Sequence, residues 1–273
     1  MLVDFHMHST SSDGVMLPKA LRAANAAAGS KVMALTDHDT IDGSFDLIQS
    51  PIPDIKVIRG CEFSSTYNNK DVHILGYEFD YANKEIKEYV EFFKEARQSR
   101  IYRMVDRCKE NGYDVCREEL EELFPHANSL GRPHLSQLLI KKGYVNTVSE
   151  AFETILHRTS PCYVPKFKAE PEDVIDLIHR AGGVAVMAHP ILIQSDEDVL
   201  ALLKLSFDGM EVYHPKHSEE DSKRYREMAL AHGLLITGGS DFHGIPKKIP
   251  LQIGDYTVER DDVSEFVKRI AQA

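Results

Sequence analysis

Short runs of β-type residues alternate along this chain with segments of helical periodicity, and this alternation restricts the fold more than any other feature. Strands separated by helical segments of about ten residues form βαβ units, whose strands pair in parallel. A set of seven such strands suits a closed or nearly closed α/β barrel better than an open sheet. The predicted strands are Leu2–His8, Lys31–His38, Lys56–Ser64, Val72–Phe79, Val184–His189, Gly209–Tyr213 and Leu234–Ser240.

One stretch interrupts the alternation. Between residues 84 and 165, helical patterns follow one another without a strand pattern. The longest predicted helix runs from Lys84 to Glu110 and ends at Asn111-Gly112, a common C-terminal signal. We therefore expect an α/β barrel built from residues 1–83 and 166–273, with residues 84–165 inserted as a helical cap subdomain.

Composition excludes several classes of protein. At 42% hydrophobic and 27% charged residues the chain is neither disordered nor fibrous, and no apolar run approaches the ~20 residues of a bilayer span. The four cysteines are scattered and the first residues lack a secretory pattern, so we expect reduced thiols and a cytoplasmic location. With 32 basic and 43 acidic side chains the net charge is −11, which argues against long nucleic acid or a membrane as partner.

Thirteen histidines are unusually many for 273 residues, and several follow a pattern. His6 and His8 lie two apart on a predicted strand, so their side chains point to the same side and can bind one ion. Asp13 follows in the next loop, and Asp241 and His243 repeat the two-residue spacing. The alternative for these histidines is a core strand whose buried rings have hydrogen-bond partners.

Four further candidates lie on or directly after other predicted strands. A carboxylate such as that of Glu62 can bridge two cations, although taken alone it is equally compatible with a surface position, and His73 taken alone fits the core. Mixed imidazole and carboxylate ligands favour zinc, manganese or iron. The nine candidates are enough for two or three divalent ions: His6, His8, Asp13, His38, Glu62, His73, His189, Asp241 and His243.

This ordered set resembles the PHP (polymerase and histidinol phosphatase) family. The segment Leu130–His134 and the ending Ser240–Gly244 are similar to a subfamily of metal-dependent phosphoesterases that act on nucleotides. The resemblance implies a distorted (β/α)7 barrel with a trinuclear centre. It implies one metal held by His6, His8, Glu62 and Asp241, a second by Glu62, His73 and His189, and a third by Asp13, His38 and His243.

The expected chemistry is metal-assisted hydrolysis, in which a hydroxide bridging the metals attacks phosphorus and no side chain acts as nucleophile. The subfamily resemblance implies small nucleotide substrates, namely nucleoside 3′,5′-bisphosphates or short 5′-phosphorylated oligonucleotides. One alternative is a phosphatase for another small metabolite such as histidinol phosphate. An alternative of a different class is a metal-binding module without catalysis. The sequence does not identify the group that acts as general acid, nor the oligomeric state.

Candidate substrate-binding residues come from three places. Arg132 and His134 lie in a polar turn before a predicted helix, where an arginine can bind a phosphate through two hydrogen bonds. Lys216 and His217 follow the sixth strand. Four arginines of the long helix share an arc of about 120°, which is usually a solvated face, and Arg100 and Arg103 are the two expected to overhang the barrel. These four are Arg97, Arg100, Arg103 and Arg107.

Overall fold

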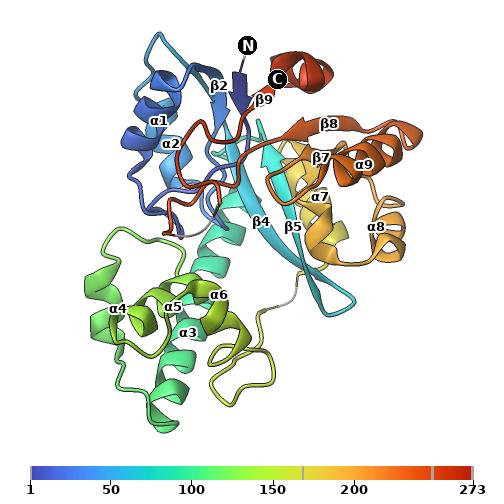
Figure 1. The fold of residues 1–273 in the computed structure, drawn as a ribbon. Helices are drawn as coiled ribbons and strands as arrows, with labels where there is room; N and C mark the ends of the chain where they lie inside the picture. Colours follow the sequence, from blue (N-terminus) through green and yellow to red (C-terminus); the bar gives the residue numbers. More distant parts are fainter. Residues whose placement is uncertain (1, 168, 247–248, 272–273) are drawn as a thin grey trace.

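The computed structural model describes residues 2–167, 169–246 and 249–271 and shows a mixed α/β fold with two β-sheets (Figure 1). The first sheet has the strand order β3-β2-β1-β9, comprising β1 (Leu2–Asp4), β2 (Ser30–Ala34), β3 (Lys56–Ile58) and β9 (Val258–Glu259). The second has the order β4-β5-β6-β7-β8, comprising β4 (Gly60–Tyr67), β5 (Lys70–Tyr77), β6 (Val184–Met187), β7 (Gly209–Tyr213) and β8 (Leu235–Gly238).

The prediction of parallel pairing is wrong for part of the second sheet. Strand β5 pairs antiparallel with both β4 and β6, whereas β6, β7 and β8 are parallel. The link between β4 and β5 is too short for a crossover, because only Asn68 and Asn69 separate the strands and both have positive φ. Such a two-residue connection forms a hairpin turn. The predicted strand Lys56–Ser64 is also divided, since β3 and β4 belong to different sheets.

The two sheets are joined beyond the ends of β1 and β2 without forming a continuous ladder. Isolated bridges join Met7 to Phe242 and His38 to Glu62, each connecting one sheet to the other. The expected α/β class is therefore confirmed, while closure of the strands into a barrel is not.

Helices of the predicted α/β portion pack against these sheets, with α7 over β4, β5 and β6 and α9 over β7 and β8. Helix α7 buries Val174, Ile175 and Ile178 on one face, and its first turn carries the acidic side chains that favour a helix N-terminus.

No helix among the described residues is both long and apolar enough to cross a bilayer. The helices are α1 (Pro18–Ala27), α2 (Asp42–Ile48), α7 (Pro171–Arg180), α8 (Asp196–Leu202), α9 (Glu219–Ala231) and α10 (Ser264–Ala271), with the short 3₁₀ helices η1 (Pro190–Ile193) and η2 (Arg260–Val263).

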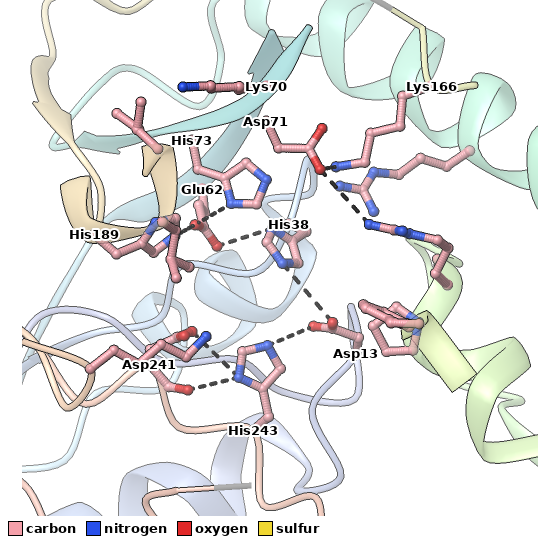
Figure 2. Close-up of a pocket in the computed structure, with 18 of the residues that line it drawn as sticks. Asp13, His38, Glu62, Lys70, Asp71, His73, Lys166, His189, Asp241 and His243 are labelled. Carbon is pink, nitrogen blue, oxygen red and sulfur yellow. Dashed lines mark hydrogen bonds and ion pairs between the residues drawn. The ribbon is translucent and has the colours of Figure 1, made fainter. Parts of the chain in front are cut away.

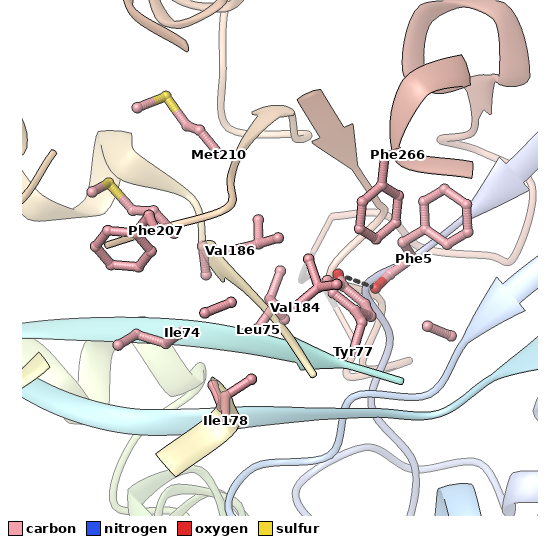
Figure 3. Packing of buried hydrophobic residues seen from close by; sticks show 14 of the residues in the cluster. Phe5, Ile74, Leu75, Tyr77, Ile178, Val184, Val186, Phe207, Met210 and Phe266 are labelled. Atoms are coloured by element: carbon pink, nitrogen blue, oxygen red, sulfur yellow. Dashed lines mark hydrogen bonds between the residues drawn. The ribbon is translucent and has the colours of Figure 1, made fainter. Parts of the chain in front are cut away.

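The main hydrophobic core contains residues of both sheets and of helices α7 to α10, and Figure 3 shows part of it. Phe5, Tyr77 and Phe266 pack edge to face in it, with ring centroids about 5 Å apart. The buried hydroxyl of Tyr77 donates a hydrogen bond of 2.8 Å to the carbonyl oxygen of Phe5, which satisfies its polar group. This contact fixes the segment after β1, from which two of the candidate ligands project.

The segment between β5 and α7 is helical, as predicted. It contains α3 (Lys84–Glu110), α4 (Arg117–Leu123), α5 (Arg132–Lys141) and α6 (Val148–Glu153). Sixteen buried residues between Ile101 and Val164 form a hydrophobic cluster of their own. Helix α3 belongs to both parts, because Ile86 near its start packs into the main core and Ile101 packs into the separate cluster. Figure 1 shows this green segment on one side of the two sheets.

Candidate metal centre

All nine predicted ligands gather at one end of the strands, although they come from positions 6 to 243 of the chain. They form overlapping groups in which the nitrogen and oxygen atoms lie within 4.8 Å of one another. The groups are His8, Asp13, His38 and His243; His6, His8 and Asp241; His6, Glu62 and His189; and His38, Glu62 and His73. Figure 2 shows these residues other than His6 and His8, facing one space.

Glu62 is the central residue of this cluster. Its Oε1 lies 2.8 Å from His73 Nδ1 and 2.9 Å from His189 Nε2. Its Oε2 lies 3.3, 3.1 and 3.0 Å from ring nitrogens of His6, His8 and His38, in that order. Each oxygen thus faces a different set of imidazoles, which is the arrangement that a carboxylate bridging two cations requires.

Two more carboxylates complete the cluster. Asp241 Oδ1 lies 3.3 Å from His8 Nε2 and 3.4 Å from His243 Nδ1. Asp13 Oδ1 lies 3.2 Å from His243 Nε2, and its Oδ2 lies 4.0 Å from His38 Nε2. The Nδ1 atom of His243 is also 2.7 Å from the backbone carbonyl of Asp241. This hydrogen bond places the ring proton on Nδ1 and leaves the Nε2 lone pair directed at Asp13.

The backbone at this end of the strands adopts unusual conformations. His189 and Asp241 have φ of 26° and 49°, which are disfavoured for residues other than glycine. Such strain is typical of functional sites, where it re-aims a side chain. Gly239 permits a further close approach, because a Cβ there would lie 2.4 Å from the backbone nitrogen of His6. Glycine at this position therefore lets the loop that carries Asp241 pack directly on the segment that carries His6.

The electrostatics of the cluster are those of a cation site. Burial would raise the pKa of Glu62, but the surrounding histidines, His38 foremost, hold it well below its usual range. Burial lowers the pKa of His38 to about 3, which keeps this ring neutral, as a metal ligand must be. Burial would also lower the pKa of His8, but hydrogen bonds to Asp241 and Glu62 raise it to about 9. The carboxylates thus attract positive charge into the centre.

Several polar atoms of the cluster are placed to bind a metal rather than to form hydrogen bonds with one another. Asp13 Oδ1, His38 Nδ1, Glu62 Oε2 and His73 Nε2 are buried and have no hydrogen-bond partner among the described residues. Buried polar atoms without a partner cost about 1–3 kcal/mol each, so they are uncommon in native proteins. Divalent cations would satisfy all four, and the mixture of nitrogen and oxygen donors suits zinc, manganese or iron.

The cluster forms the floor of a cavity of about 570 Å³, within the range of small-molecule sites. Four parts of the chain form its walls: strand β5, η1 with the residue that follows it, the loop after β7, and the insert with the segment that follows it. The cationic side chains on these walls are Lys70, Arg97, Arg100, Arg132, Arg158, Lys166 and Lys216. An anionic ligand is the chemistry that such walls favour.

The PHP domain family matches residues 4–272 of the sequence. The chain belongs to this family. A 5′-3′ exoribonuclease, Rnm, from Salmonella typhimurium is 30% identical over 253 residues, covering 89% of this chain and 85% of the relative. A 3′,5′-nucleoside bisphosphate phosphatase from Chromobacterium violaceum is 30% identical over 247 residues, covering 88% and 87%. A phosphoribosyl 1,2-cyclic phosphate 1,2-diphosphodiesterase from Eggerthella lenta is 28% identical over 254 residues, covering 92% and 97%.

Solved structures agree with this assignment. A candidate metal-dependent phosphoesterase from Bifidobacterium adolescentis superposes with a TM-score of 0.87 at 30% identity, covering 98% of this chain and 96% of the other. An amidohydrolase from Chromobacterium violaceum, solved with sulfate and without metal, gives 0.83 at 28% identity and covers 94% and 91%. The resemblance seen in the sequence is therefore confirmed, and with its relatives this PHP chain is placed among the metal-dependent hydrolases.

The structure divides the predicted substrate-binding residues of this PHP protein. Arg100, Arg132 and Lys216 line the cavity. Arg100 is 6% exposed, donates from Nε to the carbonyl of Val164, and has no hydrogen-bond partner at one terminal nitrogen among the described residues. Burial lowers the pKa of its guanidinium to about 10, so it remains charged at neutral pH. Arg132 lies over the ring of Phe152 at 4.4 Å.

The other three predicted substrate residues do not line the cavity. His134 is buried, and its two ring nitrogens contact the backbone of Gly131 and Ser12 at 3.0 and 2.7 Å, which ties α5 to the loop after β1. His217 packs between His214 and Tyr225. Arg103 is exposed on α3, although a helix rotates it by only about 60° from Arg100.

Sequence analysis missed several cavity residues. Lys70, Arg158 and Lys166 lie on separate segments, and Asp71 accepts ion pairs from Lys166 at 3.3 Å and Arg158 at 3.5 Å. No local pattern marks these residues, since their proximity depends on how the insert lies over β5. The buried carboxylate of Asp39 holds one of the wall arginines, because it accepts hydrogen bonds from the hydroxyl of Ser64 and from Nε of Arg97, the latter at 2.6 Å.

Proposed function

We propose that this chain is a metal-dependent phosphoesterase that hydrolyses phosphate monoesters of small nucleotides. The observation that carries the proposal is a cluster of nine potential ligands, seven of which line the floor of a cavity whose walls are cationic. A cluster of cations below and guanidinium or ammonium groups above would hold a phosphate ester from both sides. A metal-binding module without catalysis does not require this open, cationic cavity, so we favour the enzyme.

The nine residues would hold two to three divalent ions, Mn²⁺, Zn²⁺ or Fe²⁺, and they form overlapping groups that share His6, His8, His38 and Glu62. When bound, the ions lower the pKa of a water molecule and stabilise negative charge on phosphate oxygens. Glu62 would bridge two ion positions, and Asp13 and Asp241 would each bind at its margins. No side chain in the cluster is needed as a nucleophile.

The finer fold assignment also belongs to this proposal. We interpret the two sheets as a distorted (β/α)7 barrel, because the bridges Met7–Phe242 and His38–Glu62 join the segments after β1 and β2 to the two edges of the second sheet, at β8 and β4. Residues 84–165 would then be the cap over its ligand-bearing end, contributing Arg97, Arg100 and Arg132 to the cavity. The metals would perform the hydrolysis, and the cap would select the leaving group.

The substrate class rests on charge and on the relatives. The walls carry more cationic groups than a single phosphate requires, which suits a substrate with two phosphates. The name of one relative specifies 3′,5′-nucleoside bisphosphates, so these compounds are our first candidate. Another is named a 5′-3′ exoribonuclease, which makes short 5′-phosphorylated oligonucleotides the second. Histidinol phosphate remains an alternative, although its single phosphate leaves most of the cationic wall unused.

The test is hydrolysis by the purified chain with added Mn²⁺, followed both as inorganic phosphate from monoesters and as mononucleotide from the oligonucleotide. Adenosine 3′,5′-bisphosphate, a 5′-phosphorylated trinucleotide and histidinol phosphate would be compared at equal concentration. We expect turnover of one or both nucleotide substrates at rates well above that of histidinol phosphate. His38→Ala and Asp241→Asn should each lower turnover by orders of magnitude while the far-UV circular dichroism spectrum is retained. Metal-loaded protein that releases neither phosphate nor mononucleotide from any of the three would overturn the proposal in favour of a binding module.

A further inference from the structure

Strand β7 contributes none of the nine candidate ligands, yet two polar side chains are buried at its C-terminal end. Glu211 is 0% exposed and His214 is 1% exposed. Burying such groups costs free energy unless they are paired. Neither residue lines the cavity, so neither is placed to contact a substrate. Their positions are therefore best explained by the residues to which they form hydrogen bonds.

Glu211 accepts a hydrogen bond at each of its two oxygens. Oε1 lies 2.9 Å from Nδ1 of His6, and Oε2 lies 2.7 Å from the backbone nitrogen of His189. His6 follows β1 and His189 follows β6, so one carboxylate connects two ligand-bearing segments. These two histidines approach opposite oxygens of Glu62, at 3.3 and 2.9 Å. Glu211 thereby sets both imidazoles relative to the central carboxylate.

The contact with Glu211 also decides which nitrogen of His6 can bind a metal. A carboxylate can only accept, so Nδ1 of His6 must carry the ring proton. The Nε2 lone pair is then free, and this atom is the one that faces Glu62 and Asp241. A carboxylate behind a ligating histidine is a common means of fixing its tautomer and orientation.

His214 acts on Asp241 in the same way. The backbone N–H of Lys216 donates to its Nδ1 at 3.1 Å, so the ring proton lies on Nε2. That nitrogen is 3.4 Å from Oδ2 of Asp241, to which it donates. The other oxygen, Oδ1, faces His8 at 3.3 Å. Asp241, whose backbone is in the left-handed region, is thus oriented from behind by a buried ring.

We propose that Glu211 and His214 are positioning residues of the metal centre, which hold His6, His189 and Asp241 in the conformation that binds cations. This inference rests on the proposed function, because it assumes that the nine residues bind metal. It extends that function, because it gives strand β7 a role in the metal centre although β7 supplies none of the metal ligands.

Glu211→Gln is the direct test, because it keeps the size of the side chain. A glutamine has one acceptor oxygen, so it cannot accept from both the His6 ring and the His189 backbone, and its NH₂ must face one donor. We expect the dissociation constant for Mn²⁺, measured by calorimetry on metal-free protein, to rise about 10–100-fold. Turnover should recover as Mn²⁺ is raised, which a general loss of folding would not produce.

Asp208→Asn is the matched control. Asp208 lies at the opposite end of β7, where its Oδ2 accepts from the backbone nitrogen of Ala185 and from Nε2 of His179, both at 2.8 Å. Like Glu211, Asp208 therefore accepts hydrogen bonds from one backbone N–H and from one histidine ring. Asp208 lies far from the metal cluster, however. This variant should bind Mn²⁺ with the wild-type constant.

His214→Phe provides an independent test if Glu211→Gln does not fold. It keeps a ring in place and removes the donor to Asp241, so it should also weaken Mn²⁺ binding by at least about tenfold. Wild-type Mn²⁺ affinity in both variants would overturn the positioning role. A wild-type chain that binds no Mn²⁺ would instead overturn the proposed function itself, so the two failures are distinguishable.

Discussion

Glu62 is the residue on which the candidate centre depends most, because five imidazoles lie within 3.3 Å of its two oxygens. Its side chain is 1% exposed, so no water can replace those contacts. Removing one partner from a buried charged group is strongly destabilising, at about 3–5 kcal/mol. The identity of this one side chain should therefore affect both metal binding and turnover.

We predict that Glu62→Gln lowers bound metal by at least one ion per chain. An amide cannot bridge two cations as a carboxylate does. Turnover should fall by at least about a hundredfold, since a catalytic metal contributes several kcal/mol to transition-state stabilisation. Elemental analysis and a phosphate-release assay measure the two effects. Full metal content with normal turnover would contradict the bridging role.

A second prediction at the residue scale concerns pH. Burial lowers the pKa of Lys166 to about 8, with Asp71 opposing the shift and Arg97 adding to it. The ammonium is therefore charged below pH 8 and loses its charge as pH rises through that value. We expect kcat/KM for phosphate substrates to fall above about pH 8, because this parameter reports groups of the free enzyme.

Lys166→Arg is the matched variant, because arginine keeps its charge throughout this range. It should move the decline in kcat/KM to higher pH. The same pKa shift has a consequence for stability. The unfolded chain retains the Lys166 proton between about pH 8 and 10.5 while the folded chain has released it, so this group's contribution to stability rises with pH in that window. An unchanged pH profile in the variant would exclude Lys166 as the group responsible.

At the scale of elements, the insert connects packing with substrate binding. Arg132 begins α5, and Leu139 of the same helix is fully buried in the cluster between Ile101 and Val164. Loosening that cluster should displace Arg132 from the cavity without disturbing the ligands on the strands.

Leu139→Ala should therefore destabilise the insert by about 2–5 kcal/mol, the usual cost of such a truncation in a core. We expect KM to rise and the bound metal to stay at the wild-type amount. The control is Leu230→Ala on α9, where the side chain is 54% exposed and little should change. Thermal unfolding, KM and elemental analysis together test this. Loss of metal in Leu139→Ala would show that the insert and the centre are not separable in this way.

The elements also show what the sequence could predict. His6 and His8 were identifiable because a two-residue spacing puts side chains on one side of an extended chain. Spacing alone left His73 compatible with the core, and the family resemblance was needed to count it as a ligand, because it lies in the antiparallel strand β5 and reaches Glu62 across the hairpin rather than from the end of a parallel strand. The sequence does contain a signal for Glu211. An acidic residue between Met210 and Val212 of a buried strand requires a hydrogen-bond partner. Lys166 carried none, because its neighbours are fixed only by tertiary packing.

At the scale of the whole molecule, a chain with a net charge of −11 concentrates cationic side chains around one cavity. The acidic exterior disfavours long nucleic acid, while the cavity favours a small anion. The cytoplasmic location remains a prediction. Metal binding should also couple to global stability, because the cluster brings Asp13, Glu62 and Asp241 together within the fold.

We predict that Mn²⁺ raises the midpoint of thermal unfolding. A ligand at a hundred times its dissociation constant stabilises the folded state by about 2.7 kcal/mol, which corresponds to a shift of about 5–10 °C for a protein of this size. Chelation should reverse the shift. In Glu62→Gln the shift should be smaller, so an equal shift in this variant would indicate that Mn²⁺ binds elsewhere.

The central claim is that the nine side chains around Glu62 hold divalent cations. Anomalous diffraction from crystals soaked in Mn²⁺ tests this most directly, because it locates the ions. We predict peaks beside each oxygen of Glu62, within bonding distance of the histidines that face that oxygen. Crystals with strong peaks elsewhere, or with none among these nine residues at saturating Mn²⁺, would contradict the account.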